Sequence, residues 1–164
     1  DRIKEYNPNI KLIVLFRNPI KRAFSHWNMR RKRGNESRLF HECVLDELEM
    51  VKDKNYKATL DHYLDRGRYY RQVKYLLDNF PSKNIKIFSS NELKSSPEDT
   101  LNNIFDFLEL DKDKYKFSPV DKHKLKYNSE LEVKTIELLE EFYKEDIKKL
   151  TQLLGWDENI WKNE

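Results

Sequence analysis

Two short apolar runs along the chain are typical of buried strands in a parallel sheet. The first run comprises residues 11–16 and the second residues 85–89, and β-branched and large apolar residues dominate both. A nearly continuous apolar run indicates a strand that is buried on both faces. Because a two-stranded parallel sheet is too small for a stable α/β core, we expect further strands, either elsewhere in the chain or upstream of it.

Apolar residues at helical spacing predict helices between and after these strands. Asn18 is a favoured N-cap and Pro19 is favoured at the first helical position, so the first helix should begin directly after the first strand. The predicted helices cover residues 19–33, 38–53, 69–79, 97–108 and 130–154. Residues 112–128 have little periodicity and many lysines, and we predict a loop there. This order of strands and helices indicates an α/β fold.

The composition fits one folded domain with a local anion site. The chain has 164 residues, and its nine Phe, nine Tyr and three Trp can bury enough area for a core. A net charge of only +3 argues against a dedicated nucleic-acid binder. The single cysteine, Cys43, is predicted to be a small buried residue, and a chain without a disulfide suits a reducing compartment. The four histidines lack metal-ligand spacing, and no apolar run is long enough to span a membrane.

The segment from Arg17 to Trp27 carries the residues of a phosphate site. It follows the carboxyl end of a predicted parallel strand, where open α/β sheets bind ligands, and it starts a helix with unpaired N–H groups. Arg17 precedes that helix, Arg22 lies in its first turns, and Ser25 adds a hydroxyl donor. Guanidinium forks and a hydroxyl group at a helix start fit a bound phosphate.

The pattern R-x-P-x-x-R-A-x-S-x-aromatic in this segment resembles the 3′-phosphate-binding motif of sulfotransferases that use 3′-phosphoadenosine 5′-phosphosulfate (PAPS). The resemblance implies that Arg17 and Ser25 bind the 3′-phosphate of PAPS and of its product, adenosine 3′,5′-bisphosphate (PAP). Gly67 and Tyr69, followed by Phe80-Pro81, are similar to a G-x-Y…F-P segment of the same family. Tyr69 either stacks on the nucleotide base or packs in the core.

The resemblance covers most of the chain and is strongest to bacterial and Golgi-type carbohydrate sulfotransferases. It implies a P-loop-kinase-like α/β fold with a central parallel sheet. Residues 1–164 would be the C-terminal portion of a single sulfotransferase domain. The family's 5′-phosphosulfate loop and general base have no counterpart in residues 1–9, so we expect the catalytic residues upstream of this chain and the fragment alone to be inactive.

A second basic segment partly resembles a nucleotide-closing loop. Residues 122–126 lie where heparan sulfate sulfotransferases carry a K-x-K-G-R loop, with Leu125 in place of the glycine and Lys126 in place of the arginine. Lys124 and Lys126 are therefore predicted as further phosphate donors.

The function implied by the resemblance is sulfuryl transfer from PAPS to a hydroxyl or amine acceptor, and we expect this acceptor to be a carbohydrate. Three alternatives stay open: a nucleotide kinase-like enzyme, a non-catalytic anion- or carbohydrate-binding module, and an inactive fragment. Arg22 either binds phosphate or pairs with an acidic neighbour, and Glu47 and Glu49 are predicted to be solvated helix charges. The expected location is the bacterial cytoplasm, or the Golgi lumen in a eukaryote.

Overall fold

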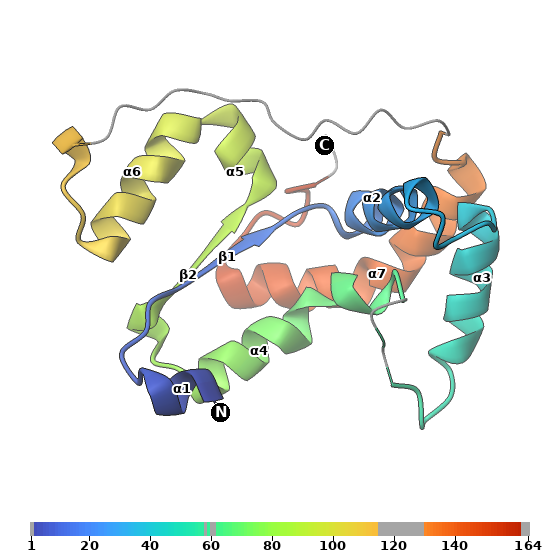
Figure 1. Cartoon of the computed structure of the whole chain (residues 1–164), viewed down its shortest axis with the longest axis horizontal. Coiled ribbons are helices and arrows are strands. Elements are labelled where there is room, and N and C mark those ends of the chain that lie inside the picture. The colour runs from blue at the N-terminus through green and yellow to red at the C-terminus, as the bar shows by residue number, and fades with distance from the viewer. Residues whose placement is uncertain (1, 58, 60–61, 115–129, 162–164) are drawn as a thin grey trace. The chain divides into compact units, whose positions relative to one another are not determined.

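The computed structural model describes residues 2–57, 59, 62–114 and 130–161 (Figure 1). The chain divides into two compact units. The sheet unit comprises Asp1–Arg17, Arg71–Lys124 and Asn159–Glu164, and the helical unit comprises Asn18–Tyr70 and Leu125–Glu158. The elements are α1 (Arg2–Tyr6), β1 (Leu12–Phe16), α2 (Pro19–Lys32), α3 (Phe40–Met50), α4 (Tyr69–Asn79), β2 (Ile85–Ser89), α5 (Ser90–Ser95), α6 (Pro97–Leu108) and α7 (Val133–Leu154), with 3₁₀ turns at Asp65–Gly67, Ser82–Asn84 and Lys112–Lys114.

The sheet unit is built on β1 and β2, which run side by side in Figure 1. The two strands are parallel, and their register runs from the pair Leu12 and Ile85 to the pair Phe16 and Ser89. Both predicted strands are therefore confirmed. Because the strands are parallel, their carboxyl ends lie at the same edge of the sheet, and Arg17 follows β1 at that edge.

Burial of β1 on both faces was a wrong prediction. Ile13 is 40% exposed and Leu15 is 51% exposed, whereas Phe16 is buried. Successive side chains of a strand point to opposite faces, so Ile13 and Leu15 share one face. That face stays open to solvent in the described part of the chain, because both of its large apolar side chains are exposed.

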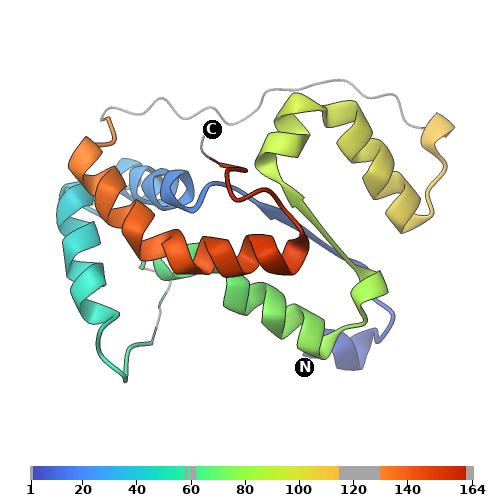
Figure 2. The ribbon, with the colours of Figure 1, turned by 180° about the vertical axis from the view of Figure 1, so that it is seen from behind.

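After β2 the chain enters two consecutive helices, α5 and α6, as Figure 2 shows. The hydroxyl of Ser89 accepts hydrogen bonds from the main-chain N–H groups of Asn91 and Glu92, at 3.2 and 3.3 Å. The Glu92 carboxylate accepts in return from the Ser89 N–H, at 2.6 Å. This reciprocal capping box starts α5, a helix that the apolar pattern did not predict.

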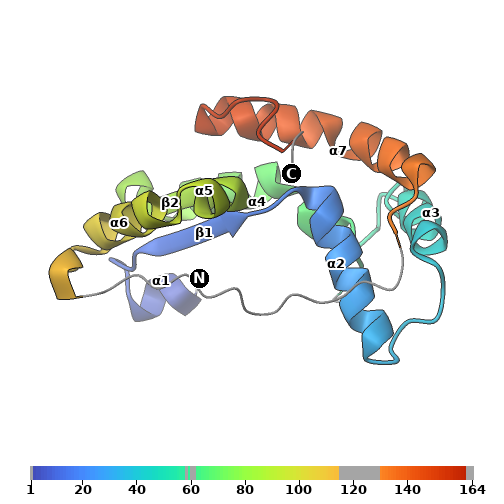
Figure 3. The same cartoon turned by 90° about the horizontal axis from the view of Figure 1, so that it is seen from above.

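The helical unit contains α2, α3 and α7 (Figure 3). Side chains of these helices pack in an aromatic core. The rings of Phe24 and Trp27 stack with their centroids 5.6 Å apart, and Phe40 meets Phe24 edge-on at 5.2 Å. Cys43 is buried beside them, as predicted. The predicted helices are confirmed, although α3 and α7 are shorter than expected, and Gly155 (φ 67°) ends α7 in the left-handed conformation that favours glycine. None of the helices in the described residues is both long and apolar enough for a membrane span.

Candidate anion site at the start of helix α2

The start of α2 is capped by its own sequence. The side-chain carbonyl of Asn18 accepts hydrogen bonds from the N–H groups of Ile20 and Lys21, at 2.9 and 3.1 Å, and Pro19 has no N–H to offer. The expectation of unpaired N–H groups is therefore wrong for Ile20 and Lys21. The positive end of the helix dipole remains, but side chains must supply the donors for an anion there.

Arg17 occupies the position that the strand pattern predicted. It directly follows Phe16, the last residue of β1, and its side chain is half-buried. No carboxylate in the described part of the chain forms an ion pair with it. A half-buried guanidinium without an acidic partner has its charge available for an anionic ligand.

The guanidinium of Arg22 turns toward the main chain of the helical unit. Its Nη2 donates to the carbonyl oxygen of Tyr63 at 2.5 Å. Its Nε is buried and lacks a hydrogen-bond partner among the described residues. Burial lowers the pKa of Arg22, and the negative charge of Glu47 works against that shift. The observed partner is thus a carbonyl, and one N–H of the guanidinium is left unsatisfied.

Ser25 lies three residues after Arg22 on α2, so the two side chains are neighbours on the helix surface. Ser25 is half-buried. His26 follows it and meets the ring of Tyr63 edge-on, with the centroids 5.0 Å apart. Tyr69 begins α4 and is 4% exposed, which fits the alternative in which it packs in the core. Lys124 and Lys126 lie outside the described residues.

Glu47 is the polar residue that the sequence pattern misjudged. It is 2% exposed, and its carboxylate accepts from the main-chain N–H groups of Tyr63, Leu64 and Asp65, at 2.6, 2.9 and 3.1 Å. The prediction of a solvated charge is wrong for Glu47, whereas Glu49 is exposed and pairs with Lys52. The sequence did contain a signal, because position 47 shares a helical face with the apolar residues at 40 and 44.

The segment that Glu47 binds is held from α7 as well. The hydroxyl of Tyr143 donates to the carbonyl oxygen of Leu64 at 2.8 Å. A Cβ atom added to Gly67 would lie 2.6 Å from the hydroxyl oxygen of Tyr143, so only glycine fits against this ring. Contacts from α2, α3 and α7 therefore hold residues 63–67, which we call the clamped loop, in one position.

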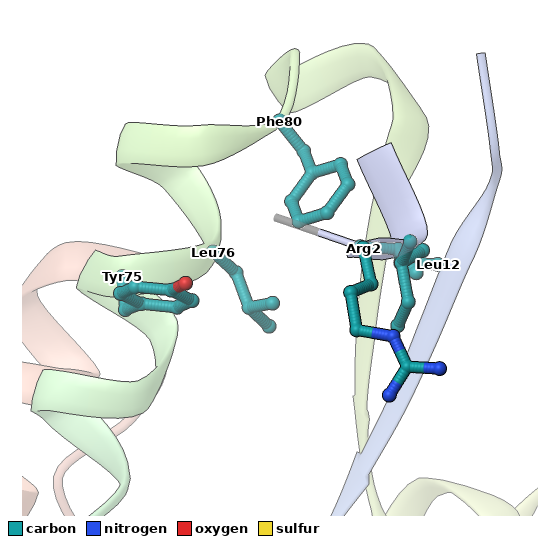
Figure 4. A pocket seen from close by; sticks show the side chains of 6 residues that line it. Arg2, Leu12, Tyr75, Leu76 and Phe80 are labelled. Atoms are coloured by element: carbon teal, nitrogen blue, oxygen red, sulfur yellow. The ribbon is translucent and has the colours of Figure 1, made fainter. Parts of the chain in front are cut away.

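A pocket of about 480 Å³ lies elsewhere, in the sheet unit (Figure 4). Its lining residues are Arg2, Ile3, Leu12, Tyr75, Leu76 and Phe80. Leu12 is the first residue of β1, so the pocket lies at the amino end of that strand and Arg17 at the carboxyl end. Since α/β sheets bind ligands at the carboxyl ends of their strands, this pocket is not the candidate site. The described residues contain no His, Cys, Asp and Glu cluster that could hold a metal ion.

Comparisons with known proteins agree with the motif. A family model described as sulfotransferase domain matches residues 3–141. The structure is similar to the crystal structure of a sulfotransferase from Alicyclobacillus acidocaldarius, with a TM-score of 0.77 and 28% sequence identity. The match covers 95% of this chain but only 59% of that chain, so this chain spans about three-fifths of its length. No curated protein matches the sequence. The predicted α/β fold is confirmed by the structural similarity.

Proposed function

The chain belongs to the sulfotransferase domain family, and from this premise we propose that it serves sulfuryl transfer from PAPS to a hydroxyl or amine of a carbohydrate. In this proposal Arg17 and Ser25 bind the 3′-phosphate of the donor, and Arg22 assists them. The carbohydrate acceptor rests on the resemblance to carbohydrate sulfotransferases.

The main support for the proposal is the position of the motif in the fold, between the carboxyl end of β1 and the helix α2. Arg17 follows a parallel strand at its carboxyl end, and Ser25 is on the helix that comes next along the chain. The residues fit an anion, because Arg17 has no acidic partner among the described residues and Arg22 keeps a buried, unsatisfied Nε. The Asn18 cap leaves the side chains as the phosphate donors.

These residues would act by holding the donor in register. The acceptor oxygen or nitrogen attacks sulfur in line and gives its proton to a base. The bond from sulfur to the 5′-phosphate oxygen breaks, and PAP leaves with the electron pair of that bond. Such a transfer depends on positioning and on stabilising developing charge. The 3′-phosphate is remote from the sulfur, so Arg17 and Ser25 contribute binding energy and distinguish PAPS from ATP, which has no 3′-phosphate. No residue of this chain is assigned to the reacting sulfur.

Calorimetric titration with PAP, with adenosine 5′-monophosphate (AMP) as the control, tests the proposal. We expect the chain to bind PAP clearly more tightly than AMP. Arg17→Ala should weaken PAP binding about 10- to 150-fold, because a charge-assisted hydrogen bond contributes roughly 1.5–3 kcal/mol. Binding of AMP should hardly change.

Arg33→Ala is the matched control, since Arg33 is exposed at the far end of α2. It removes the same charge and should leave PAP binding within about twofold, a change below 0.5 kcal/mol. Circular dichroism must show that each variant is folded. Equal losses for PAP and AMP in Arg17→Ala, or no preference for PAP in the folded native chain, would overturn the 3′-phosphate assignment.

A further inference from the structure

Glu47 and Arg22 both form hydrogen bonds with the main chain of Tyr63, a residue of the clamped loop. The N–H of Tyr63 donates to the carboxylate of Glu47 at 2.6 Å, and the carbonyl oxygen of Tyr63 accepts from Arg22 at 2.5 Å. Glu47 belongs to α3 and Arg22 to α2, so Tyr63 links the two helices. The position of the Arg22 guanidinium thus depends on where Glu47 holds the Tyr63 main chain.

The Glu47 carboxylate is saturated by the loop. Besides three main-chain N–H groups, the hydroxyl of Tyr56 lies 3.3 Å from its Oε1. A buried carboxylate is costly unless hydrogen bonds satisfy it, and the three main-chain donors do so here. A glutamine at position 47 would point its NH₂ group at main-chain N–H donors. Both terminal atoms of the side chain must therefore be hydrogen-bond acceptors.

We propose that Glu47 is a positioning residue of the anion site: it fixes the Tyr63 main chain and thereby sets the Arg22 guanidinium beside Ser25. As far as it concerns PAP, this proposal rests on the proposed function. Tyr143 holds the neighbouring residue Leu64, so the loop cannot shift to follow Arg22. Arg22 and Ser25 are three residues apart on α2, so the placement of one guanidinium decides whether both side chains face one anion.

The test compares Glu47→Gln with Glu49→Gln. Both variants remove one charge from α3, but Glu49 is exposed and lies outside the network. The first measurement is the NMR signal of the Arg22 Nε–Hε group, assigned through Arg22→Lys. We expect Glu47→Gln to shift or broaden this signal and Glu49→Gln to leave it unchanged. The second measurement is PAP affinity, which should fall about tenfold or more in Glu47→Gln alone, equivalent to about 1.4 kcal/mol.

A double-mutant cycle separates positioning from a loss of stability. If Glu47 acts through Arg22, the double variant Glu47→Gln/Arg22→Lys should bind PAP as weakly as Arg22→Lys alone, within about twofold. Additive losses in folded variants would contradict the proposal. Glu47→Asp, which keeps the charge on a shorter side chain, should recover part of the PAP affinity.

The outcomes separate this proposal from the proposed function. An unchanged Arg22 signal in Glu47→Gln overturns the positioning role, whether or not the affinity for PAP changes. A changed signal with unchanged PAP affinity overturns the link to the anion site. If the native chain does not prefer PAP over AMP, the proposed function fails while the Arg22 signal still tests the role of Glu47.

Should Glu47→Gln fail to fold, Tyr56→Phe removes the hydroxyl group that lies 3.3 Å from the carboxylate and leaves the charge in place. The same two measurements then apply. A small shift of the Arg22 signal with a two- to fivefold loss of PAP affinity would support the proposal, and no change in either would overturn it.

Discussion

The core of the helical unit and one face of strand β1 in the sheet unit cover their apolar side chains to different degrees. In the helical unit Leu64, Leu139 and Tyr143 are completely buried among α2, α3 and α7. In the sheet unit Ile13 and Leu15 of β1 are exposed on one face. Helices that pack on one another can cover their apolar stripes, whereas two strands expose a face unless another layer covers it. The same kind of residue therefore contributes differently in the two units.

Charged side chains also differ in burial, and both units carry exposed ion pairs, such as that of Glu49 with Lys52 in the helical unit. In the helical unit Glu47 is buried and bound by main-chain N–H groups. In the sheet unit the pairs of Lys74 with Asp78 and of Lys112 with Asp106 lie at the surface. Water screens surface pairs, whereas a buried carboxylate depends on each of its donors. The burial of a charged side chain, and not the number of its ion pairs, should therefore decide how much it contributes to the free energy of unfolding.

The largest difference is expected for the same substitution in the two units. Leu139→Ala removes a fully buried side chain from the helical core and should lower the free energy of unfolding by about 2–5 kcal/mol. Leu15→Ala, on the open face of β1, should cost less than about 1 kcal/mol. Urea unfolding followed by circular dichroism measures both. Equal losses would show that this face of β1 is covered in solution and that the two side chains contribute equally to stability.

A smaller effect should show how tightly the clamped loop is packed. Gly67→Ala places a methyl group 2.6 Å from the hydroxyl oxygen of the buried Tyr143, and we expect a loss of about 1–3 kcal/mol in the free energy of unfolding. Gly34→Ala is the control, because nothing lies within 4 Å of its added Cβ. Its φ of 75° still costs about 1 kcal/mol for a residue with a side chain. A loss in Gly67→Ala below that of Gly34→Ala would mean that the Tyr143 ring can move.

A third prediction concerns pH and a carboxylate of the helical unit. The Glu36 carboxylate accepts from the Nε and Nη2 of Arg38, at 3.0 and 2.9 Å, and from the hydroxyl of Tyr63, at 2.9 Å. Hydrogen bonds from Arg38 chiefly lower the pKa of Glu36. Its stabilisation is therefore complete above the pKa of an unfolded glutamate, about 4.3, and is lost as pH falls below that value.

Glu36→Gln should therefore cost about 1–2 kcal/mol at neutral pH. The difference from the native chain should shrink as pH falls below about 4. Urea midpoints of both proteins at several pH values measure it. A difference that stays constant down to about pH 2 would mean that folding does not lower the pKa of Glu36.

Local signals in the sequence were sufficient for most elements. Asn18 and Pro19 mark the start of α2, Gly155 marks the end of α7, and the apolar run at residues 85–89 coincides with β2. In each case the residues that give the signal lie at or next to the end of the element, so local propensity determines where the element begins or ends. The helix α5 was missed although Ser89 begins an S-x-x-E capping box, because six residues show no helical period.

Features that depend on distant contacts could not be predicted. The burial of Glu47 requires residues 63–65 to meet α3, and the partner of Arg22 lies 41 residues away in the sequence. The open face of β1 depends on what other elements cover, which an apolar run does not reveal. The motif predicts Arg17 and Ser25 as phosphate ligands, but it does not reveal that the side chain of Asn18 already binds the N–H groups of Ile20 and Lys21.

The smallest effect is expected at a surface pair of the sheet unit. The Nζ of Lys74 lies 3.2 Å from the Oδ1 of Asp78 one turn further along α4, and both side chains are more than half exposed. Lys74→Ala should change the free energy of unfolding by no more than about 0.5 kcal/mol, because water screens the pair and the lysine precedes the acid in the less favourable order. Urea midpoints at about 0.05 M and about 0.5 M salt should agree closely for the variant. A loss as large as that of Glu36→Gln would mean that exposure does not decide how much a charged side chain stabilises the fold. The contrast between the helical core and the open face of β1 would then rest on apolar burial alone.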